Sequence, residues 1–202
     1  MMRSRLGATA GVVGPLAFAG AWVIGSLKTN GYSMVNDAIS RLAAVGADTR
    51  ALMTAGFVSF TICVLIFSLS LRAALPGGAW IAAASTAIAT LGVAAFPLDH
   101  SGTVDALHGL SATIGYVTLA ATSLLASRQL KAQGDHRAAK VSALAGTATA
   151  LCLAATILGP ADGLFQRLGV SIGDLWIVAA SVRMIRIADR PRPVPAGAER
   201  PR

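Results

Sequence analysis

Carboxylate and imidazole side chains gather in one short segment of the sequence, FPLDHSGTVDALH, which runs from Phe96 to His108. Asp105 and His108 are one helical turn apart, and Asp99 and His100 stand just before them. A carboxylate beside an imidazole can orient it as a general base, and several such groups can hold a divalent metal ion. The spacing matches no tight metal-ligand motif, so the sequence predicts neither a bound metal nor a cofactor. The plainer interpretation of His108 is a helix-end histidine bonded to a loop carbonyl.

A second polar segment, residues 33–42, has the pattern of a short amphipathic helix with Ser33 as its N-cap. Its apolar residues fall on one face and Asp37, Ser40 and Arg41 on another, as in a helix that lies in the membrane interface. Alternatively, Asp37 and Arg41, four residues apart, simply pair with each other on an exposed surface. Either way, these three side chains are candidate site residues.

A third group of candidates consists of Arg167, Asp174 and Trp176. We expect Asp174 to lie about two turns below the outer end of the last hydrophobic run, where it needs a partner. Arg167 is about two turns away on the same helix, and alternatively it faces Asp37, Asp99 or lipid phosphate. Trp176 is expected to pack against its neighbours or to lie in the aromatic belt.

The composition indicates what kind of fold positions these residues. Of the 202 residues, 54% are hydrophobic and 13% charged, whereas a soluble domain has roughly a quarter charged residues. The mean hydropathy is +0.65, which is more apolar than one water-soluble core can hide. The sequence therefore predicts a multi-pass membrane protein without a separate soluble catalytic domain.

Six hydrophobic runs predict an all-α bundle of six transmembrane helices, with the short interfacial helix between the first two. The runs cover residues 6–27, 51–71, 79–96, 104–127, 141–159 and 168–188. Residues 1–188 form a single integral membrane domain in this interpretation. Residues 189–202, rich in arginine and proline, are predicted to be a disordered cytoplasmic tail.

The basic residues predict the orientation. Thirteen of the 17 lie on the side of both termini and four on the other, namely Lys28, Arg41, Arg50 and Arg167. By the positive-inside rule, both termini are cytoplasmic, and the protein is integral to a bacterial cytoplasmic membrane. The net charge of +8 does not indicate nucleic-acid binding, because the basic residues flank the spans rather than form a folded basic face.

Several motifs together resemble the bacterial membrane family catalogued as domain of unknown function 998. They are Gly14-Pro15, Gly31-Tyr32-Ser33 followed by Asp37, Ser40 and Leu42, Phe96-Pro97 with Asp99 and His108, and Gly163 with Arg167 before Trp176. The resemblance implies a multi-pass architecture and supports the choice of site residues, but it implies no reaction. Gln166 stands where the resemblance leads us to expect an acidic residue.

We expect Asp37, Asp99, His108 and Arg167 to converge in one outward-facing polar pocket, with Tyr32 or Trp176 as an apolar wall. An arginine among carboxylates suits a lipid headgroup, a small molecule or a membrane partner. Membrane lipids are the expected surroundings and the expected source of a ligand. The alternative is a lipid-modifying or hydrolytic enzyme of the outer leaflet, with Asp99, His108 and Asp37 as its catalytic centre.

The sequence favours binding over the other classes of function. No nucleophile motif or phosphate-binding glycine loop is present, which disfavours an enzyme. None of the six runs, as bounded above, has an ionisable residue at its centre, which disfavours a proton- or ion-coupled transporter. A haem carrier is disfavoured because His100 and His108 lie near one end and His136 lies in a loop.

Overall fold

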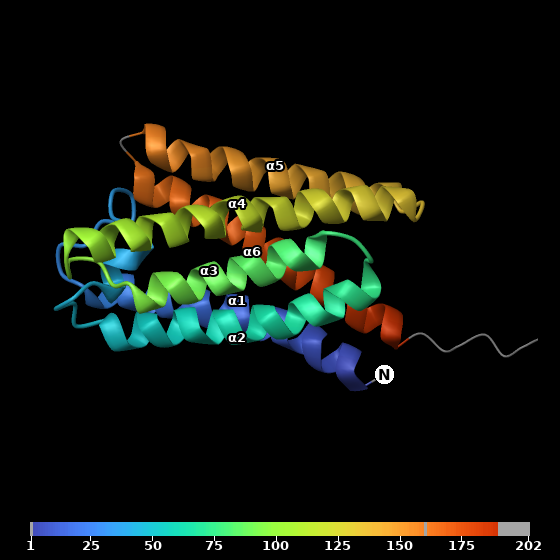
Figure 1. The fold of residues 1–202 in the computed structure, drawn as a ribbon, viewed down its shortest axis with the longest axis horizontal. Coiled ribbons are helices and arrows are strands. Elements are labelled where there is room, and N and C mark those ends of the chain that lie inside the picture. The colour runs from blue at the N-terminus through green and yellow to red at the C-terminus, as the bar shows by residue number, and fades with distance from the viewer. Residues whose placement is uncertain (1, 160, 190–202) are drawn as a thin grey trace, which may run out of the picture.

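The hydrophobic runs become helices in a computed structural model of the chain, which describes residues 2–159 and 161–189 (Figure 1). In this part of the chain every regular element is helical, as predicted. The elements are α1 Met2–Lys28, the 3₁₀ helix η1 Ile39–Ala43, α2 Arg50–Ala74, α3 Ala79–Ala95, α4 Gly102–Ala132, α5 His136–Leu158 and α6 Asp162–Ala188. Five of the helices are long and apolar enough to cross a membrane. The 17-residue α3 is about 26 Å long, which is near the lower limit for a span.

The six long helices form a closed ring. Each packs mainly against its neighbours in the chain, and α6 packs against α1. Figure 1 shows that α1 begins and α6 ends at the same end of the bundle, which we call the terminal end. The connections 29–49 and 96–101, the end of α5 and the beginning of α6 lie at the opposite end, which we call the loop end. Most of the candidate site residues therefore lie at the loop end.

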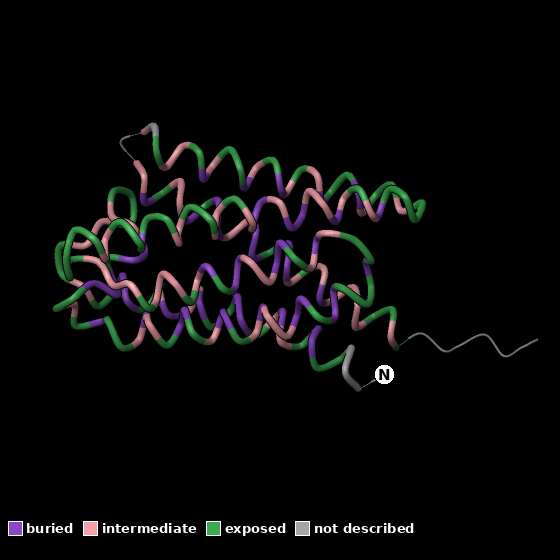
Figure 2. Tube along the Cα trace, viewed as in Figure 1, coloured by how far each residue is buried: buried purple, intermediate pink, exposed green. Residues whose placement is uncertain are grey.

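Apolar side chains lie both inside and outside the bundle. The interior contains Phe18, Phe60 and Phe67, and the rings of Phe18 and Phe60 are 5.4 Å apart. Large aliphatic side chains such as Leu151 and Leu175 are two-thirds exposed, and exposed positions run along the outer faces of the helices (Figure 2). An exterior this apolar suits contact with lipid. The structure therefore supports a helical membrane bundle.

The predicted interfacial helix is shorter and more buried than expected. Only Ile39–Ala43 is helical, and Ile39 and Leu42 are buried in the loop end of the bundle. The preceding turn is closed by side chains, because the Asn36 amide donates to Ser33 Oγ at 3.2 Å. The Ser33 amide in turn donates to the Asp37 carboxylate at 2.7 Å. Such side-chain bonds compete with the helical ladder, which explains the non-helical start.

The last helix begins six residues earlier than predicted, at Asp162 instead of Leu168. Its polar first turns are stabilised by the loop end, where the Leu164 amide donates to the Val35 carbonyl at 2.9 Å. Asp174 is therefore about 18 Å along a helix of 27 residues, close to its middle. Asp174 thus lies about three turns from the beginning of α6, because the helix begins earlier than the predicted run.

The terminal end carries two ion pairs. Asp189 pairs with Arg5, which joins the end of α6 to the beginning of α1. Arg183 Nη2 lies 2.6 Å from Asp135, the N-cap of α5, whose carboxylate also accepts from the Ala138 amide at 3.0 Å. Apart from Asp189, the predicted tail of residues 189–202 lies outside the described residues.

Acid should remove part of the stability that Asp135 contributes. The Ala138 amide and, more weakly, Arg183 lower the pKa of Asp135 against the opposing effect of burial. A lowered pKa means that the stabilisation is complete above the ordinary value of 3.8 and is lost as the pH falls through the folded-state value. We expect wild type to melt above Asp135→Asn at neutral pH and to lose this advantage in acid. Thermal unfolding in nanodiscs from neutral to acidic pH measures the difference in melting temperature between the two proteins. A difference that stays constant across that pH range contradicts the prediction.

Candidate functional site

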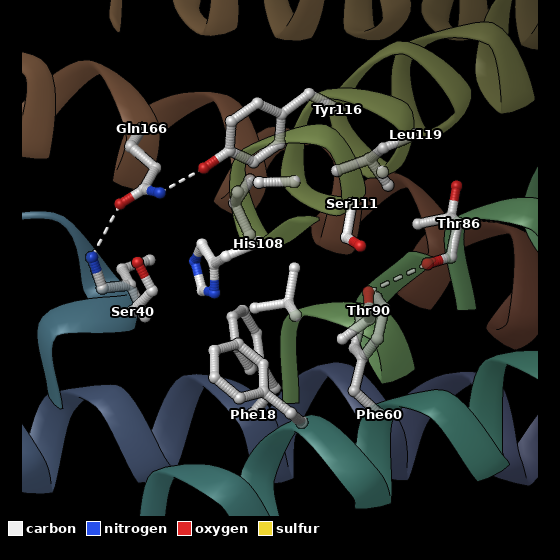
Figure 3. A pocket seen from close by; sticks show the side chains of 16 residues that line it. Phe18, Ser40, Phe60, Thr86, Thr90, His108, Ser111, Tyr116, Leu119 and Gln166 are labelled. Carbon is white, nitrogen blue, oxygen red and sulfur yellow. Dashed lines mark hydrogen bonds between the residues drawn. The ribbon is translucent and has the colours of Figure 1, made fainter. Parts of the chain in front are cut away.

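A small cavity opens at the loop end, inside the ring of helices (Figure 3). Its volume is about 70 Å³. Aromatic side chains of α1 and α2 line one side, and polar side chains of η1, α3, α4 and α6 line the other. The aromatic residues are Phe18, Phe57 and Phe60, and the polar ones are Ser40, Thr86, Thr90, His108, Ser111, Tyr116 and Gln166. The cavity is therefore amphipathic, and no Asp, Glu, Lys or Arg is among the described residues that line it.

His108 presents one ring nitrogen to this cavity. Its Nδ1 lies 2.7 Å from the Phe96 carbonyl, which can only accept, so Nδ1 carries a proton. Nε2 is then an acceptor in the neutral ring. Among the described residues no protein group bonds Nε2, and the ring, only 5% exposed, points into the cavity beside Ser40 (Figure 3). His108 is thus both a helix-end residue held by a loop carbonyl and a wall of the cavity.

Gln166 holds η1 at the mouth of the cavity, a role that the sequence did not reveal. Its Oε1 accepts from the Ile39 amide at 2.7 Å, and its Nε2 donates to the Tyr116 hydroxyl. An amide suits this position because its oxygen accepts and its nitrogen donates. The contact fixes Ser40, the residue after Ile39, against the cavity.

Arg167 lies beside the cavity, in a separate buried cluster. Its Nη1 donates to the carbonyls of Met34, Asp37 and Gly163 at 2.8, 2.8 and 2.9 Å. Its Nη2 donates to the Tyr32 hydroxyl. The guanidinium carbon also lies 5.4 Å from the Tyr32 ring centre. Arg167 is only 6% exposed, so this charge is held by backbone carbonyls and aromatic faces rather than by a carboxylate.

Tyr32 completes the Arg167 cluster as a neutral phenol. Burial raises the pKa of Tyr32, and the Arg167 guanidinium only partly opposes that rise. The hydroxyl therefore keeps its proton at neutral pH and donates it to the Ala38 carbonyl at 2.9 Å. Tyr32 thus links α6 to the chain that enters η1.

The carboxylates of Asp99 and Asp105, at the loop end, have their partners outside the Arg167 cluster. Arg41 Nη1 lies 2.8 Å from Asp99, so the alternative pairing of Arg41 with Asp37 is wrong. Asp105 accepts from the Asp99 amide at 3.0 Å, which supports the left-handed backbone of Asp99 at φ 62°. The Arg41 and Asp99 side chains are half exposed, where such a pair contributes little stability. Among the described residues, neither Asp99 nor Asp105 forms a hydrogen bond or an ion pair with His108.

Trp176 and Asp174 lie away from the loop-end cavity. Trp176 lines a second cavity of about 390 Å³ at the terminal end, and its Nε1 donates to Ser142 Oγ at 2.9 Å. Asp174 is buried in the middle of α6. The predicted site residues are thus divided among four places. Ser40 and His108 line the loop-end cavity, Tyr32, Asp37 and Arg167 form the adjacent cluster, Arg41 and Asp99 lie on the surface, and Asp174 and Trp176 lie deeper.

A metal centre finds no support in the described part of the chain. No three His, Cys, Asp or Glu side chains there lie close enough together to share a metal ion. Cys63 and Cys152 are free thiols in α2 and α5.

Replacing Arg167 by Gln should cost about 3 kcal/mol of unfolding free energy, because buried carbonyls lose a charged donor. The variant should be coupled to Tyr32→Phe by about 1 kcal/mol or more, because the two side chains are in contact. It should be additive with Asp99→Asn, whose carboxylate pairs with Arg41. Two double-mutant cycles in detergent measure both energies. Coupling of Arg167 to Asp99 above about 1 kcal/mol contradicts the separation of the two clusters.

One comparison with known proteins identifies the family. No curated protein and no solved structure matches the chain. A family model described as "Protein of unknown function (DUF998)" matches residues 12–183, which include all six long helices in whole or in part. The match also includes the loop-end cavity and the Arg167 cluster. The chain therefore belongs to the DUF998 family of proteins of unknown function.

Proposed function

We propose that this protein binds a small uncharged amphiphile in the loop-end cavity and does not convert it. The observation that carries the proposal is a set of three polar groups, Ser40 Oγ, His108 Nε2 and Ser111 Oγ. They line the cavity, and no hydrogen bond from another described residue reaches them. Polar groups that line a cavity in this way can be bonded by a ligand or by water. Phe18 and Phe60 supply an apolar wall opposite.

The size of the cavity limits what it can hold. Its 70 Å³ is room for the centres of about five water molecules and far less than the several hundred Å³ of a typical ligand pocket. A whole lipid headgroup does not fit. A hydroxyl or carbonyl group with a short apolar chain does, and a longer chain has to leave through the mouth of the cavity toward lipid or water.

The positions of the carboxylates support binding rather than catalysis. An Asp/His centre needs a carboxylate on His108 Nδ1, which instead bonds the Phe96 carbonyl. The Asp99 carboxylate forms an ion pair with Arg41. The lipid-modifying or hydrolytic alternative therefore lacks an assembled acid–base pair in this conformation.

The proposal also includes the orientation. We place the loop end on the outer face of a bacterial cytoplasmic membrane and both termini in the cytoplasm, because only four of the 17 basic residues belong to the loop end. The loop-end cavity then receives its ligand from the outer leaflet or from the outer solution.

Filling the cavity should remove a bound molecule. We expect native mass spectrometry of wild type, incubated with a total lipid extract, to detect an additional small mass on the protein. Ala112→Leu, which enlarges a lining residue, should lose it. Ala106→Leu, on the exposed face of the same helix, is the matched control and should keep it. An unchanged adduct in Ala112→Leu contradicts the binding site. Chemical conversion of an added lipid that is abolished by His108→Gln supports an enzyme instead.

Cysteine labelling in intact cells tests the orientation. Single cysteines at the exposed positions His100 and Ala132, in a chain whose native Cys63 and Cys152 are replaced by alanine, mark the two ends of α4. An impermeant maleimide should modify the His100→Cys chain and spare the Ala132→Cys chain until the membrane is permeabilised. The reverse labelling pattern contradicts the proposed orientation.

A further inference from the structure

The larger of the two cavities described above lies at the terminal end and has no part in the proposed function. Its volume is about 390 Å³, within the range of roughly 300–1,000 Å³ that is usual for ligand pockets. The ends of α2, α4 and α6 and the beginning of α5 enclose it. It shares no described lining residue with the loop-end cavity, so the two cavities are separate sites.

The inner part of the terminal-end cavity is apolar. Its lining consists of side chains from three helices, namely Leu71 and Leu75 of α2, Leu130 of α4, and Trp176 and Ala180 of α6. The Trp176 Nε1 donates to Ser142 Oγ at 2.9 Å, so the one polar atom of the indole is already bonded. Such a lining suits an acyl chain, because an acyl chain gains free energy from leaving water and needs no hydrogen-bond partner.

Charged residues gather at the outer end of the same cavity. The lining there includes Asp135, Arg137 and Arg183. Arg183 follows Trp176 by seven residues, so it lies on the same face of α6 and about 10 Å nearer the end of the helix. The cavity is therefore charged at its mouth and apolar farther in, which is the arrangement that a long-chain amphiphile requires.

One positive charge at this mouth has no counter-charge. Asp135 already binds Arg183 Nη2 at 2.6 Å and the Ala138 amide at 3.0 Å. No ion pair in the described chain includes Arg137, which is an exposed residue. A guanidinium can bind a carboxylate through two parallel N–H groups. A zwitterionic headgroup would bring a cation for which the described lining has no free acid, so the mouth matches a single negative charge.

We propose that the terminal-end cavity binds a long-chain fatty acid, with its carboxylate at Arg137 and its acyl chain directed toward Trp176. Gln133 also lines the cavity, and its side-chain amide can donate a further hydrogen bond to the carboxylate. This site is independent of the uncharged amphiphile proposed for the loop-end cavity, because the two ligands differ in charge and bind at opposite ends of the bundle.

Photolabelling of the unaltered chain tests the position of the ligand. The probe is palmitic acid with a diazirine near its methyl end, added to protein in phosphatidylcholine nanodiscs in mildly alkaline buffer. We expect the labelled peptides, identified by mass spectrometry, to contain inner lining residues such as Leu71 or Trp176. Labelling confined to peptides outside the cavity overturns the proposal.

Competition on the same chain tests the headgroup. Excess palmitic acid should abolish the labelling. Hexadecanol has the same chain length without the charge and should compete about fivefold less well, because it forms no ion pair with the exposed guanidinium. Equal competition by hexadecanol overturns the role of Arg137. Lysophosphatidylglycerol that displaces the probe better than palmitic acid overturns the assignment of a carboxylate headgroup.

Two variants with matched controls test the two parts of the site. Ala180→Phe fills the inner cavity and should lose the labelling, whereas Ala150→Phe, at an exposed position of α5 outside the lining, should keep it. Arg137→Gln should weaken the labelling about fivefold. Lys140→Gln removes an exposed charge from the same helix outside the lining and should leave the labelling unchanged. Full labelling in Ala180→Phe or in Arg137→Gln overturns the proposal.

Discussion

The bonding of the Arg167 guanidinium organises the loop end of this protein. A buried cation in a membrane bundle needs acceptors, and no carboxylate supplies them here, so the chain brings three backbone carbonyls to it. The approach requires Gly163, because a Cβ at that position would stand 2.5 Å from the Asp37 carbonyl oxygen. The connection between α1 and α2 is therefore packed onto α6 instead of lying free on the membrane surface.

The cavity depends on that packing. With the 34–38 segment held by Arg167 and Tyr32, η1 enters the end of the ring, where Gln166 binds its first amide. Ser40 then faces His108, whose orientation is determined separately by the Phe96 carbonyl at the end of α3. The polar wall of the cavity thus consists of groups from four elements, η1, α3, α4 and α6.

The helices could be predicted from the sequence because lipid and core both demand apolar residues, which makes each span a continuous hydrophobic run. The beginning of α6 could not be predicted in this way, because Gln166 and Arg167 are polar. Their burial depends on a loop more than 120 positions earlier in the chain. The same is true of Arg41, which has a carboxylate four residues before it and instead binds Asp99, 58 positions away. Residue type and spacing thus show where polar side chains cluster in the sequence, but not which partners the fold brings to them.

Arg167 and Asp174 show why position along a span decides how a buried charge is neutralised. Both lie on the face of α6 that is turned toward α1. At the end of the helix, a non-helical segment has free carbonyls, so a guanidinium can be neutralised by backbone atoms. In the middle, the neighbouring helices have already used their backbone groups in their own ladders, and only side chains remain as partners. Those near Asp174 are uncharged, and the described chain leaves its Oδ1 without a bond. One face of α6 thus holds a cation bonded by backbone carbonyls at the beginning of the helix and a carboxylate oxygen without a bond in the described chain at its middle.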